Sequence, residues 1–117
     1  MEKTSWEKIE AEALNPGLTR QMLHGENLSF ARLQIKNGTV VPRHQHVNEQ
    51  LSVVTEGKVR FRFDDREIFV AKGEMILIPP DVPHAAEAIG DSETLDIFAP
   101  CREDWKAKKD DYLRAKK

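Results

Sequence analysis

The sequence predicts an all-β fold, a small barrel or sandwich built from short strands. Short runs rich in β-branched and aromatic residues follow one another between residues 28 and 99, separated by glycine, proline or aspartate turns. No helical pattern lies between these runs, which argues against a parallel α/β sheet. With 117 residues and an apolar fraction of 39%, the chain suffices for one compact core, so residues 1–117 are expected to form one domain.

The predicted strands begin after an N-terminal arm. Residues 1–25 are expected to form this arm, in which Asn15-Pro16-Gly17 marks a turn and Trp6 covers a barrel edge. Glu56-Gly57-Lys58 predicts a hairpin between two of the strands. Residues 26–101 form the predicted barrel, with strands at Leu28–Lys36, Leu51–Thr55, Val59–Phe63, Glu67–Ala71, Met75–Ile78, His84–Ile89 and Leu95–Ala99.

Residues 102–117 have a helical pattern. Acidic residues lie near the start of this segment and basic residues at its end, which the helix dipole favours. Trp105, Tyr112 and Leu113 form one narrow apolar stripe. The segment is therefore expected to be a C-terminal helix packed on the outside of the barrel, with its lysines in solvent.

The net charge and the cysteine content indicate which classes of partner and which cellular compartment to expect. The net charge is −2, which provides no electrostatic attraction for nucleic acid or an anionic membrane, so neither is expected as a partner. The longest apolar runs, such as Met75–Pro80, are too short to span a bilayer. The acidic start lacks the pattern of a secretory signal, and the single Cys101 excludes an internal disulfide. A cytoplasmic location is therefore expected.

Three histidines lie where a metal ion could be bound. His44 and His46 are two residues apart, so on a strand both imidazoles point to one face, and Gln50 shares their parity. His84 follows a proline-rich turn at the start of a later strand. Glu49 has the opposite parity, but a bulge would reverse it, so Glu49 remains an alternative ligand.

Glycines frame these residues in two blocks. The first is Gly-x5-His-x-His-x3-Gln-x6-Gly from Gly38 to Gly57, and the second is Gly-x5-Pro-x4-His from Gly73 to His84. The blocks resemble the paired motifs of the cupin superfamily, in which two histidines and a glutamate of the first block and one histidine of the second bind a metal. The resemblance implies a small double-stranded β-helix, or jelly-roll, barrel that binds one divalent transition metal through His44, His46, Gln50 and His84.

Two positions depart from the cupin pattern. Asp81 stands where the second block usually has glycine, and aspartate adopts a left-handed turn conformation at modest cost. Gln50 replaces the usual glutamate, so a bound divalent ion would keep its full charge. This favours a Lewis acid over the carboxylate-containing site of a non-haem iron oxygenase. The donor set does not distinguish nickel, zinc, iron, manganese and copper.

The last predicted strand carries a second group of candidate site residues. Asp96 and Phe98 share one face, so Asp96 would point into the barrel if that face is interior. A buried acid is costly unless it is paired or functional. The alternative is that Asp96 pairs with Arg60 or Arg62 and that Arg102 begins a surface helix.

Three features of the chain resemble the KdgF-type cupins, known as pectin degradation proteins. They are the segment LDIFAPCRED from Leu95 to Asp104, the glutamine at position 50 and the Trp-Glu pair at residues 6 and 7. These enzymes linearise 4,5-unsaturated uronates from pectin or alginate. The resemblance implies a sugar-acid substrate and catalytic roles for three residues of this segment. Asp96 would be the base, Phe98 an apolar wall, and Arg102 the partner of a substrate carboxylate.

Two other functions fit the same pattern. A cupin dioxygenase would consume oxygen at bound iron or copper, and a non-catalytic cupin would bind a sugar or another ligand without turnover. A homodimer is also expected, because small barrels often bury an exposed edge against a second subunit.

Overall fold

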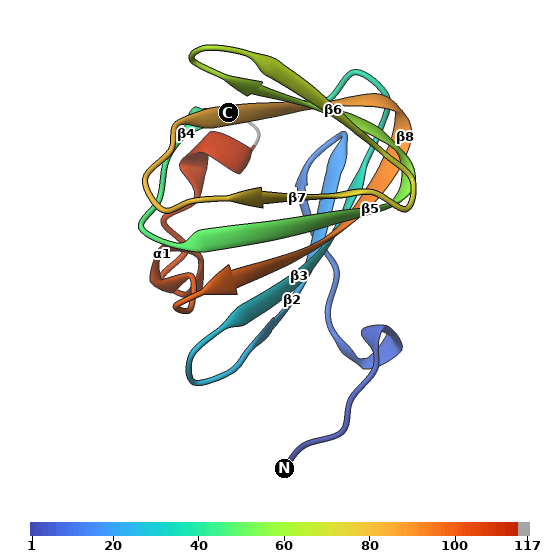
Figure 1. The fold of residues 1–117 in the computed structure, drawn as a ribbon. Helices are drawn as coiled ribbons and strands as arrows, with labels where there is room; N and C mark the ends of the chain where they lie inside the picture. Colours follow the sequence, from blue (N-terminus) through green and yellow to red (C-terminus); the bar gives the residue numbers. More distant parts are fainter. Residues whose placement is uncertain (115–117) are drawn as a thin grey trace.

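The computed structural model describes residues 1–114 and shows an all-β architecture, as predicted (Figure 1). Most of the chain lies in antiparallel strands, and only short helical turns occur at its two ends. The strands are β1 (Glu12–Asn15), β2 (Leu18–His24), β3 (Ser29–Ile35), β4 (Val40–His44), β5 (Glu49–Phe63), β6 (Glu67–Ala71), β7 (Met75–Ile78) and β8 (His84–Ala99).

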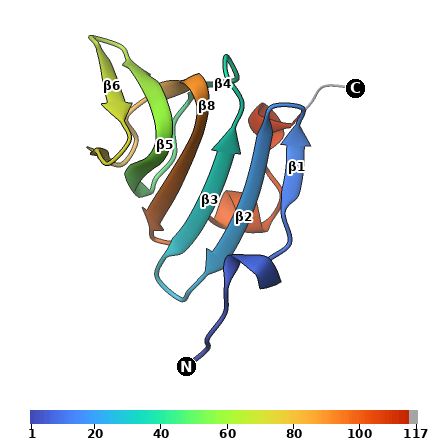
Figure 2. The same ribbon diagram turned by 90° about the vertical axis from the view of Figure 1, so that its right-hand side faces the viewer.

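Two long strands, β5 and β8, join the sheet into two layers (Figures 1 and 2). The first half of β5 pairs with β7 and with the second half of β8, and β3, β2 and β1 extend this layer. The second half of β5 pairs with β6 and with the first half of β8, which also pairs with β4. Apolar side chains fill the space between the layers, which is the barrel arrangement that the sequence predicts.

The predicted hairpin at Glu56–Lys58 is wrong, because β5 continues through it. Gly57 has a φ of 75°, and a Cβ at this position would lie 2.4 Å from the carbonyl oxygen of Asp91. The glycine therefore permits a bulge at which the strand bends while it stays paired with β8. Likewise, the two strands predicted on either side of Gly90 are one strand, β8.

Much of the predicted N-terminal arm is β-structure. β1 and β2 extend the sheet beyond β3, and the predicted turn between them is present, with the Gly17 N–H donating to Asn15 Oδ1 at 2.9 Å. Before β1, the short helix η1 (Trp6–Lys8) brings the Trp6 ring to 5.3 Å from the ring of Phe30, between centroids. Only two buried leucines, Leu14 and Leu18, mark these strands as part of the core, so their sequence pattern was weak.

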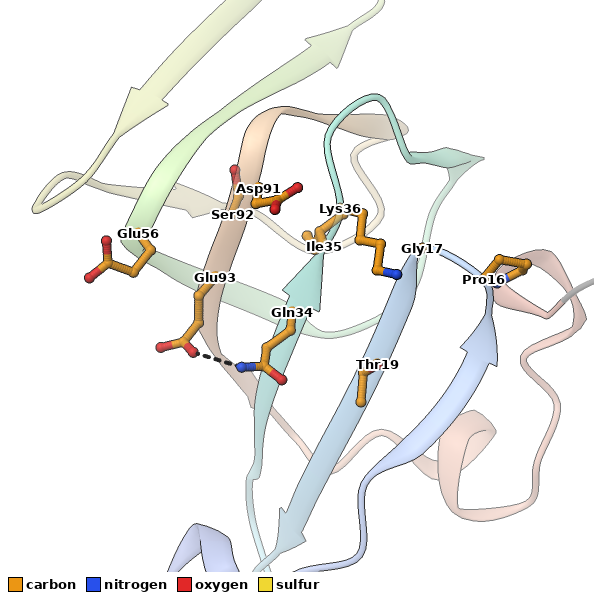
Figure 3. Close-up of a pocket in the computed structure, with 10 residues that line it drawn as sticks. All are labelled: Pro16, Gly17, Thr19, Gln34, Ile35, Lys36, Glu56, Asp91, Ser92 and Glu93. Atoms are coloured by element: carbon orange, nitrogen blue, oxygen red, sulfur yellow. Dashed lines mark hydrogen bonds between the residues drawn. The ribbon is translucent and has the colours of Figure 1, made fainter.

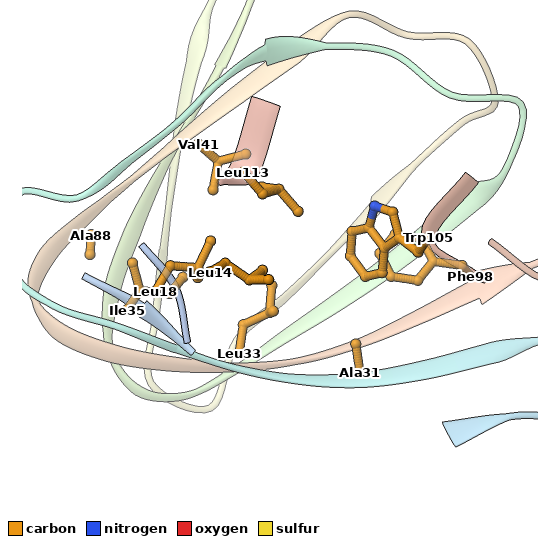
Figure 4. Close-up of a cluster of buried hydrophobic side chains, with 10 residues drawn as sticks. All are labelled: Leu14, Leu18, Ala31, Leu33, Ile35, Val41, Ala88, Phe98, Trp105 and Leu113. Carbon is orange, nitrogen blue, oxygen red and sulfur yellow. The ribbon is translucent and has the colours of Figure 1, made fainter. Parts of the chain in front are cut away.

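Two clusters of buried apolar side chains hold the layers together. The smaller contains Val54, Val59, Phe61, Val70 and Ile78. The larger, drawn in Figure 4, contains Leu14, Leu18, Ala31, Leu33, Ile35, Val41, Ala88, Phe98, Trp105 and Leu113. In it Trp105 packs against Phe98, with ring centroids 5.0 Å apart, and Leu113 lies beside Val41. Residues from the C-terminal segment are therefore part of the core.

The predicted helix over residues 102–117 is replaced by two short helices, α1 (Glu103–Lys106) and η2 (Asp111–Leu113). Lys108, at a φ of 57°, interrupts the helical conformation between them. Burial of Trp105 and Leu113 inside the barrel requires this break, and tertiary packing overrides the helical pattern. Residues 115–117 of the prediction lie outside the described residues. No helix within residues 1–114 has the length and apolar character needed to cross a membrane.

Buried ion pairs fasten this C-terminal segment, residues 103–114, to the first two strands. Asp110 and Arg20 are both fully buried, and their Oδ2 and Nη2 atoms lie 2.7 Å apart. Arg114 donates to the other carboxylate oxygen of Asp110 at 2.7 Å, and Asn15 donates to the carbonyl of Leu113 at 2.7 Å. Only Nη2 of Arg20 is paired, and its Nε and Nη1 atoms have no partner among residues 1–114. The contacts of Asp110 with Arg20 and Arg114 nevertheless tie the segment to the barrel.

Candidate metal centre and adjoining pocket

Three histidines converge at one end of the barrel. His44 ends β4, His46 lies in the loop before β5, and His84 begins β8, where it pairs with His44 in the β4–β8 ladder. Their ligating nitrogen atoms lie within 4.8 Å of one another. Three imidazole nitrogens at this spacing could hold a divalent transition metal.

Backbone carbonyls set the tautomer of each histidine. Nδ1 of His44 lies 2.8 Å from the carbonyl of Pro42, and Nδ1 of His84 lies 2.8 Å from that of Val82. Nδ1 of His46 is 3.1 Å from the carbonyl of residue 48. A carbonyl oxygen only accepts, so each Nδ1 carries its hydrogen and each Nε2 presents a lone pair. This arrangement orients all three rings as metal ligands.

Burial keeps the histidines neutral. Desolvation lowers the pKa of His44 to about 4 and that of His46 to about 4, and the neighbouring positive groups act in the same direction. The pKa of His84 is also lowered, again chiefly by burial. Neutral imidazole is the form that binds a metal, so the site needs no proton release from these rings at neutral pH.

Gln50 lies beside the histidines and is buried, whereas Glu49 is exposed. The Gln50 amide donates to Ser52 Oγ at 2.9 Å, which turns its Oε1 atom toward His46 Nε2 at 3.0 Å. Both of these facing atoms are acceptors and repel each other unless a cation lies close to both. Adjacent ligands about 2.1 Å from an ion lie about 3 Å apart when they subtend a right angle.

A further observation supports the fit to a metal ion. The Nε2 atom of His84 is buried and has no hydrogen-bond partner among residues 1–114. An unpaired buried nitrogen costs free energy, on the order of 1–3 kcal/mol, which coordination to a cation would recover. The donors present therefore match a site for one divalent ion.

Asp96 lies on β8, where it is buried and paired across the ladder with Ser52. Burial raises the pKa of its carboxyl from 3.8 to about 6, against the opposing effects of the nearby Ser52 and Thr94 hydroxyls and the charge of Arg102. Its Oδ1 atom has no hydrogen-bond partner within the described part of the chain. The alternative predicted for Asp96, an ion pair with Arg60 or Arg62, is not found, because both arginines bind other carboxylates.

The two candidate arginine partners of Asp96 bind other carboxylates. Arg60 pairs with Glu87, and Arg62 lies 3.6 Å from Glu67. Both arginines alternate with the buried side chains of β5, and they face away from the core. The carboxyl of Asp96 thus remains available inside the barrel.

Arg102 is buried next to the pocket rather than exposed on a surface helix. Its Nε and Nη2 atoms donate to the two carboxylate oxygens of Asp104 at 2.9 and 2.8 Å. Its guanidinium carbon lies 4.7 Å from the ring centroid of Phe98 and 4.0 Å from that of Trp105. These contacts immobilise a cation above the apolar wall that Phe98 forms.

One internal cavity brings most of these groups together. It has a volume of about 40 Å³ and is lined by side chains that include His44, Gln50, His84, Asp96, Phe98, Arg102, Trp105, Tyr112 and Leu113. The predicted ligands and the predicted catalytic residues therefore meet around one space, with His46 beside His84 at a ring separation of 5.2 Å.

A larger hollow of about 330 Å³ lies elsewhere, between the turn at Gly17 and residues 91–93 (Figure 3). Its polar side chains include Gln34 and Glu93, which approach each other at 3.4 Å. None of the histidines lines it, and the side chains drawn in Figure 3 present no converging metal donors or buried titratable group. The smaller cavity is therefore the candidate functional site.

Comparison with known proteins agrees with this arrangement. Residues 31–98 match the family model described as Cupin domain. The chain belongs to the cupin family. This cupin is also 32% identical, over 95 residues, to an uncharacterised protein of Methanocaldococcus jannaschii, a match that covers 75% of this chain and 76% of the relative.

Solved cupin structures share the fold over most of the chain. An RmlC-like cupin from Shewanella frigidimarina superposes with a TM-score of 0.81 at 30% identity, covering 87% of this chain and 93% of the other. KdgF from a Halomonas species superposes with a TM-score of 0.78 at 24% identity, covering 85% of this chain and 94% of that one. The left-handed Asp81, at a φ of 62°, fits the turn where cupins usually have glycine.

Two residues at the site were not predicted from the sequence. Asn48 is buried, and its amide donates to the carbonyls of Pro100 and Cys101 at 2.6 and 3.1 Å, which links the histidine loop to the segment before Arg102. Tyr112 was assigned only to an external apolar stripe, yet its ring stacks on His44 with centroids 4.6 Å apart. Asn48 stands at an unspecified position of the first block and Tyr112 lies outside both blocks, so neither contact had a signal in the sequence.

Proposed function

We propose that this cupin is a metal-dependent enzyme that opens 4,5-unsaturated uronates to linear 5-keto acids. The observation that supports the proposal is the meeting of a histidine cluster, a buried acid and a buried arginine around one cavity. It is supported further by the resemblance of the segment from Leu95 to Asp104 to the KdgF-type cupins. A cytoplasmic location, a sugar-acid substrate and a homodimer belong to the same proposal.

In this proposal His44, His46, Gln50 and His84 hold one divalent ion. Bound there, the ion would supply Lewis-acid polarisation of substrate oxygens. Gln50 is preferred over Glu49 because its carbonyl oxygen points toward His46 while Glu49 is exposed. A neutral fourth ligand leaves the positive charge of the site undiminished, which suits an anionic substrate.

Asp96 would act as the base. Its raised pKa, about 6, leaves the carboxylate mostly ionised at neutral pH and makes it more basic than an ordinary aspartate. It would accept the proton of the anomeric hydroxyl as the bond between the anomeric carbon and the ring oxygen breaks. The enolate that this leaves on the former ring oxygen would then take a proton at C4, which Asp96 can return, and become the 5-keto acid. Proton and electron counts balance without another reactant.

Arg102 and Phe98 would bind and orient the substrate. The guanidinium is held in place by Asp104, so its charge is available without a loss of side-chain entropy on binding. Phe98, which is almost fully buried, presents an apolar surface to the ring and limits water near Asp96. The aspartate, phenylalanine and arginine thus divide proton transfer, packing and charge recognition.

The test is direct. Metal-loaded protein is mixed with unsaturated uronate from a pectin or alginate lyase digest, and absorbance of the unsaturated chromophore is followed. The expected result is a loss faster than the spontaneous reaction, abolished by Asp96→Asn and Arg102→Ala with metal content unchanged. Arg62→Ala, which removes an exposed arginine, is the control and keeps the activity. Absence of acceleration by metal-loaded wild type would overturn the proposal.

The same experiment separates the alternative functions. Oxygen uptake with bound iron or copper that survives Asp96→Asn would identify a dioxygenase. Ligand binding without any product, followed by NMR, would identify a non-catalytic cupin. Either result would replace the linearising activity as the function of the pocket.

The homodimer has its own support. A row of apolar residues crosses the outer face of one layer, with each member opposite the next in the ladders: Leu23, Phe30, Ile97, Leu51 and Leu77. Leu77 is 61% exposed and Leu23 is 40% exposed, so the row is available to a second copy of the chain. Light scattering should give twice the mass of the monomer, and Leu77→Lys should reduce it. A monomeric wild type would refute the dimer.

A further inference from the structure

Arg102 cannot offer its usual two-pronged edge to a ligand. The Nε–Nη2 edge of the guanidinium is occupied by Asp104, and Nη2 also donates to the hydroxyl of Tyr112 at 3.0 Å. Nη1 has no acceptor among residues 1–114. A ligand carboxylate next to Arg102 therefore needs a second donor from another residue to be held at both oxygens.

Tyr112 is placed to be that donor. Its hydroxyl oxygen accepts from Arg102 Nη2 at 3.0 Å and from Trp105 Nε1 at 3.1 Å. These two donors use the lone pairs of the phenol, so its own hydrogen points elsewhere, and no acceptor for it occurs within residues 1–114. A cationic donor on the oxygen also polarises the O–H bond and strengthens it as a donor.

We propose that Tyr112 is a further substrate-contacting residue, whose hydroxyl and Arg102 Nη1 together bind the carboxylate of the ligand. The identity of the ligand as a sugar acid rests on the function proposed above, whereas carboxylate recognition by this pair rests on the contacts of Arg102 and Tyr112. The stacking of the Tyr112 ring on His44 places the hydroxyl close to the metal ligands. The carboxylate would therefore lie between the guanidinium of Arg102 and the histidine cluster.

Tyr112 also determines how much room the ligand has. The cavity of about 40 Å³ holds a few water molecules, whereas small-molecule sites enclose about 300 Å³ or more. Tyr112 and Leu113 both line this cavity, so the positions of their side chains help to set the space next to Arg102.

The test compares an acid with its uncharged ester. The two ligands are D-galacturonate, which lacks the double bond and is not turned over, and its methyl ester. Calorimetry measures the binding of each ligand to the zinc-loaded wild type and to zinc-loaded Tyr112→Phe. This variant keeps the ring and its stacking on His44 and removes only the hydroxyl. We expect the dissociation constant for galacturonate to rise about tenfold, because a hydrogen bond to a charged group is lost, and that for the ester to change less than twofold.

Three results would overturn the assignment: no galacturonate binding by the wild type, an unchanged affinity in Tyr112→Phe, or equal losses for acid and ester. Zinc content and thermal unfolding of the variant check that the fold and the metal centre are intact. The outcome is independent of the proposed activity. Acid-specific loss in Tyr112→Phe, in a protein that does not linearise unsaturated uronates, supports the carboxylate site and removes the proposed function. If the protein linearises unsaturated uronates but Tyr112→Phe shows no acid-specific loss of affinity, the proposed function is supported and the carboxylate site is refuted.

Discussion

Replacement of Asp96 by asparagine tests whether burial raises the pKa of this carboxyl. Asparagine has nearly the same shape and cannot ionise, so it removes the cost of a buried charge. The rise from 3.8 to about 6 corresponds to about 3 kcal/mol of stability, at about 1.36 kcal/mol for each pH unit. The folded protein binds this proton more tightly than the unfolded chain does. The contribution of Asp96 to the free energy of unfolding is therefore largest at low pH and is lost as pH rises through about 6.

The contribution of Asp96 to the free energy of unfolding falls in a predictable way between pH 5 and pH 8. With these two pKa values, about half of this contribution is already lost at pH 5 and nearly all of it at pH 8. The difference in stability between Asp96→Asn and wild type should therefore shift by about 1–2 kcal/mol in favour of the variant between pH 5 and pH 8. Effects of the substitution that do not depend on pH cancel in this comparison.

Urea unfolding of both proteins at several pH values measures this shift. The proteins are kept metal-free with a chelator, because a bound cation would lower the pKa of a nearby acid. Glu49→Gln, at an exposed carboxylate, controls for the general loss of one negative charge. A stability difference that stays constant between pH 5 and pH 8, or that moves against the variant, would refute the burial argument and weaken the role of Asp96 as a base.

Three further predictions follow from the contacts described above. His84→Ala should lose stoichiometric zinc in metal analysis after dialysis, while His24→Ala, at a histidine outside the cluster, should keep it; equal zinc in both would contradict the ligand assignment. Asp110→Asn should lower the free energy of unfolding by about 2–4 kcal/mol in urea titration, because it leaves the buried charge of Arg20 with Glu12 as its one carboxylate partner, and a change below about 1 kcal/mol would exclude a structural role. Gly57→Ala should cost about 2–5 kcal/mol, since the new Cβ meets backbone at 2.4 Å, whereas Gly73→Ala, also at positive φ but in open space, should cost about 1–2 kcal/mol; equal costs would contradict the bulge.

Local patterns in the sequence predict the barrel well and its connections less well. Alternation and turn residues identify the strands because side-chain period and backbone conformation are properties of a few neighbouring residues. The same short-range information cannot tell a hairpin from a bulge at Gly57, since both need a positive φ. Pairing of both halves of β5 with β8, which are far apart in sequence, makes the choice.

Some features of the candidate site could likewise be predicted from the sequence, and others depend on tertiary packing. The resemblance of the two glycine-framed blocks to the cupin motifs predicts that His44, His46 and His84 meet, and the structure brings them together. The occupation of one edge of Arg102 by Asp104 and the placement of Tyr112 depend on how the C-terminal segment packs. A helical stripe predicts which of its residues are apolar and leaves open which side of the barrel they cover.

The sequence by itself therefore determined an all-β cupin with a histidine cluster, since strand period, glycine spacing and residue chemistry are written locally. Only the tertiary structure decided that residues 103–114 enter the barrel and close its cavity. The reason is energetic: Trp105 and Leu113 gain more from burial in the core than from an exposed helix, and the pairing of Asp110 with Arg20 compensates the charges buried with them. That packing brings the ring of Tyr112 onto His44 in the histidine cluster.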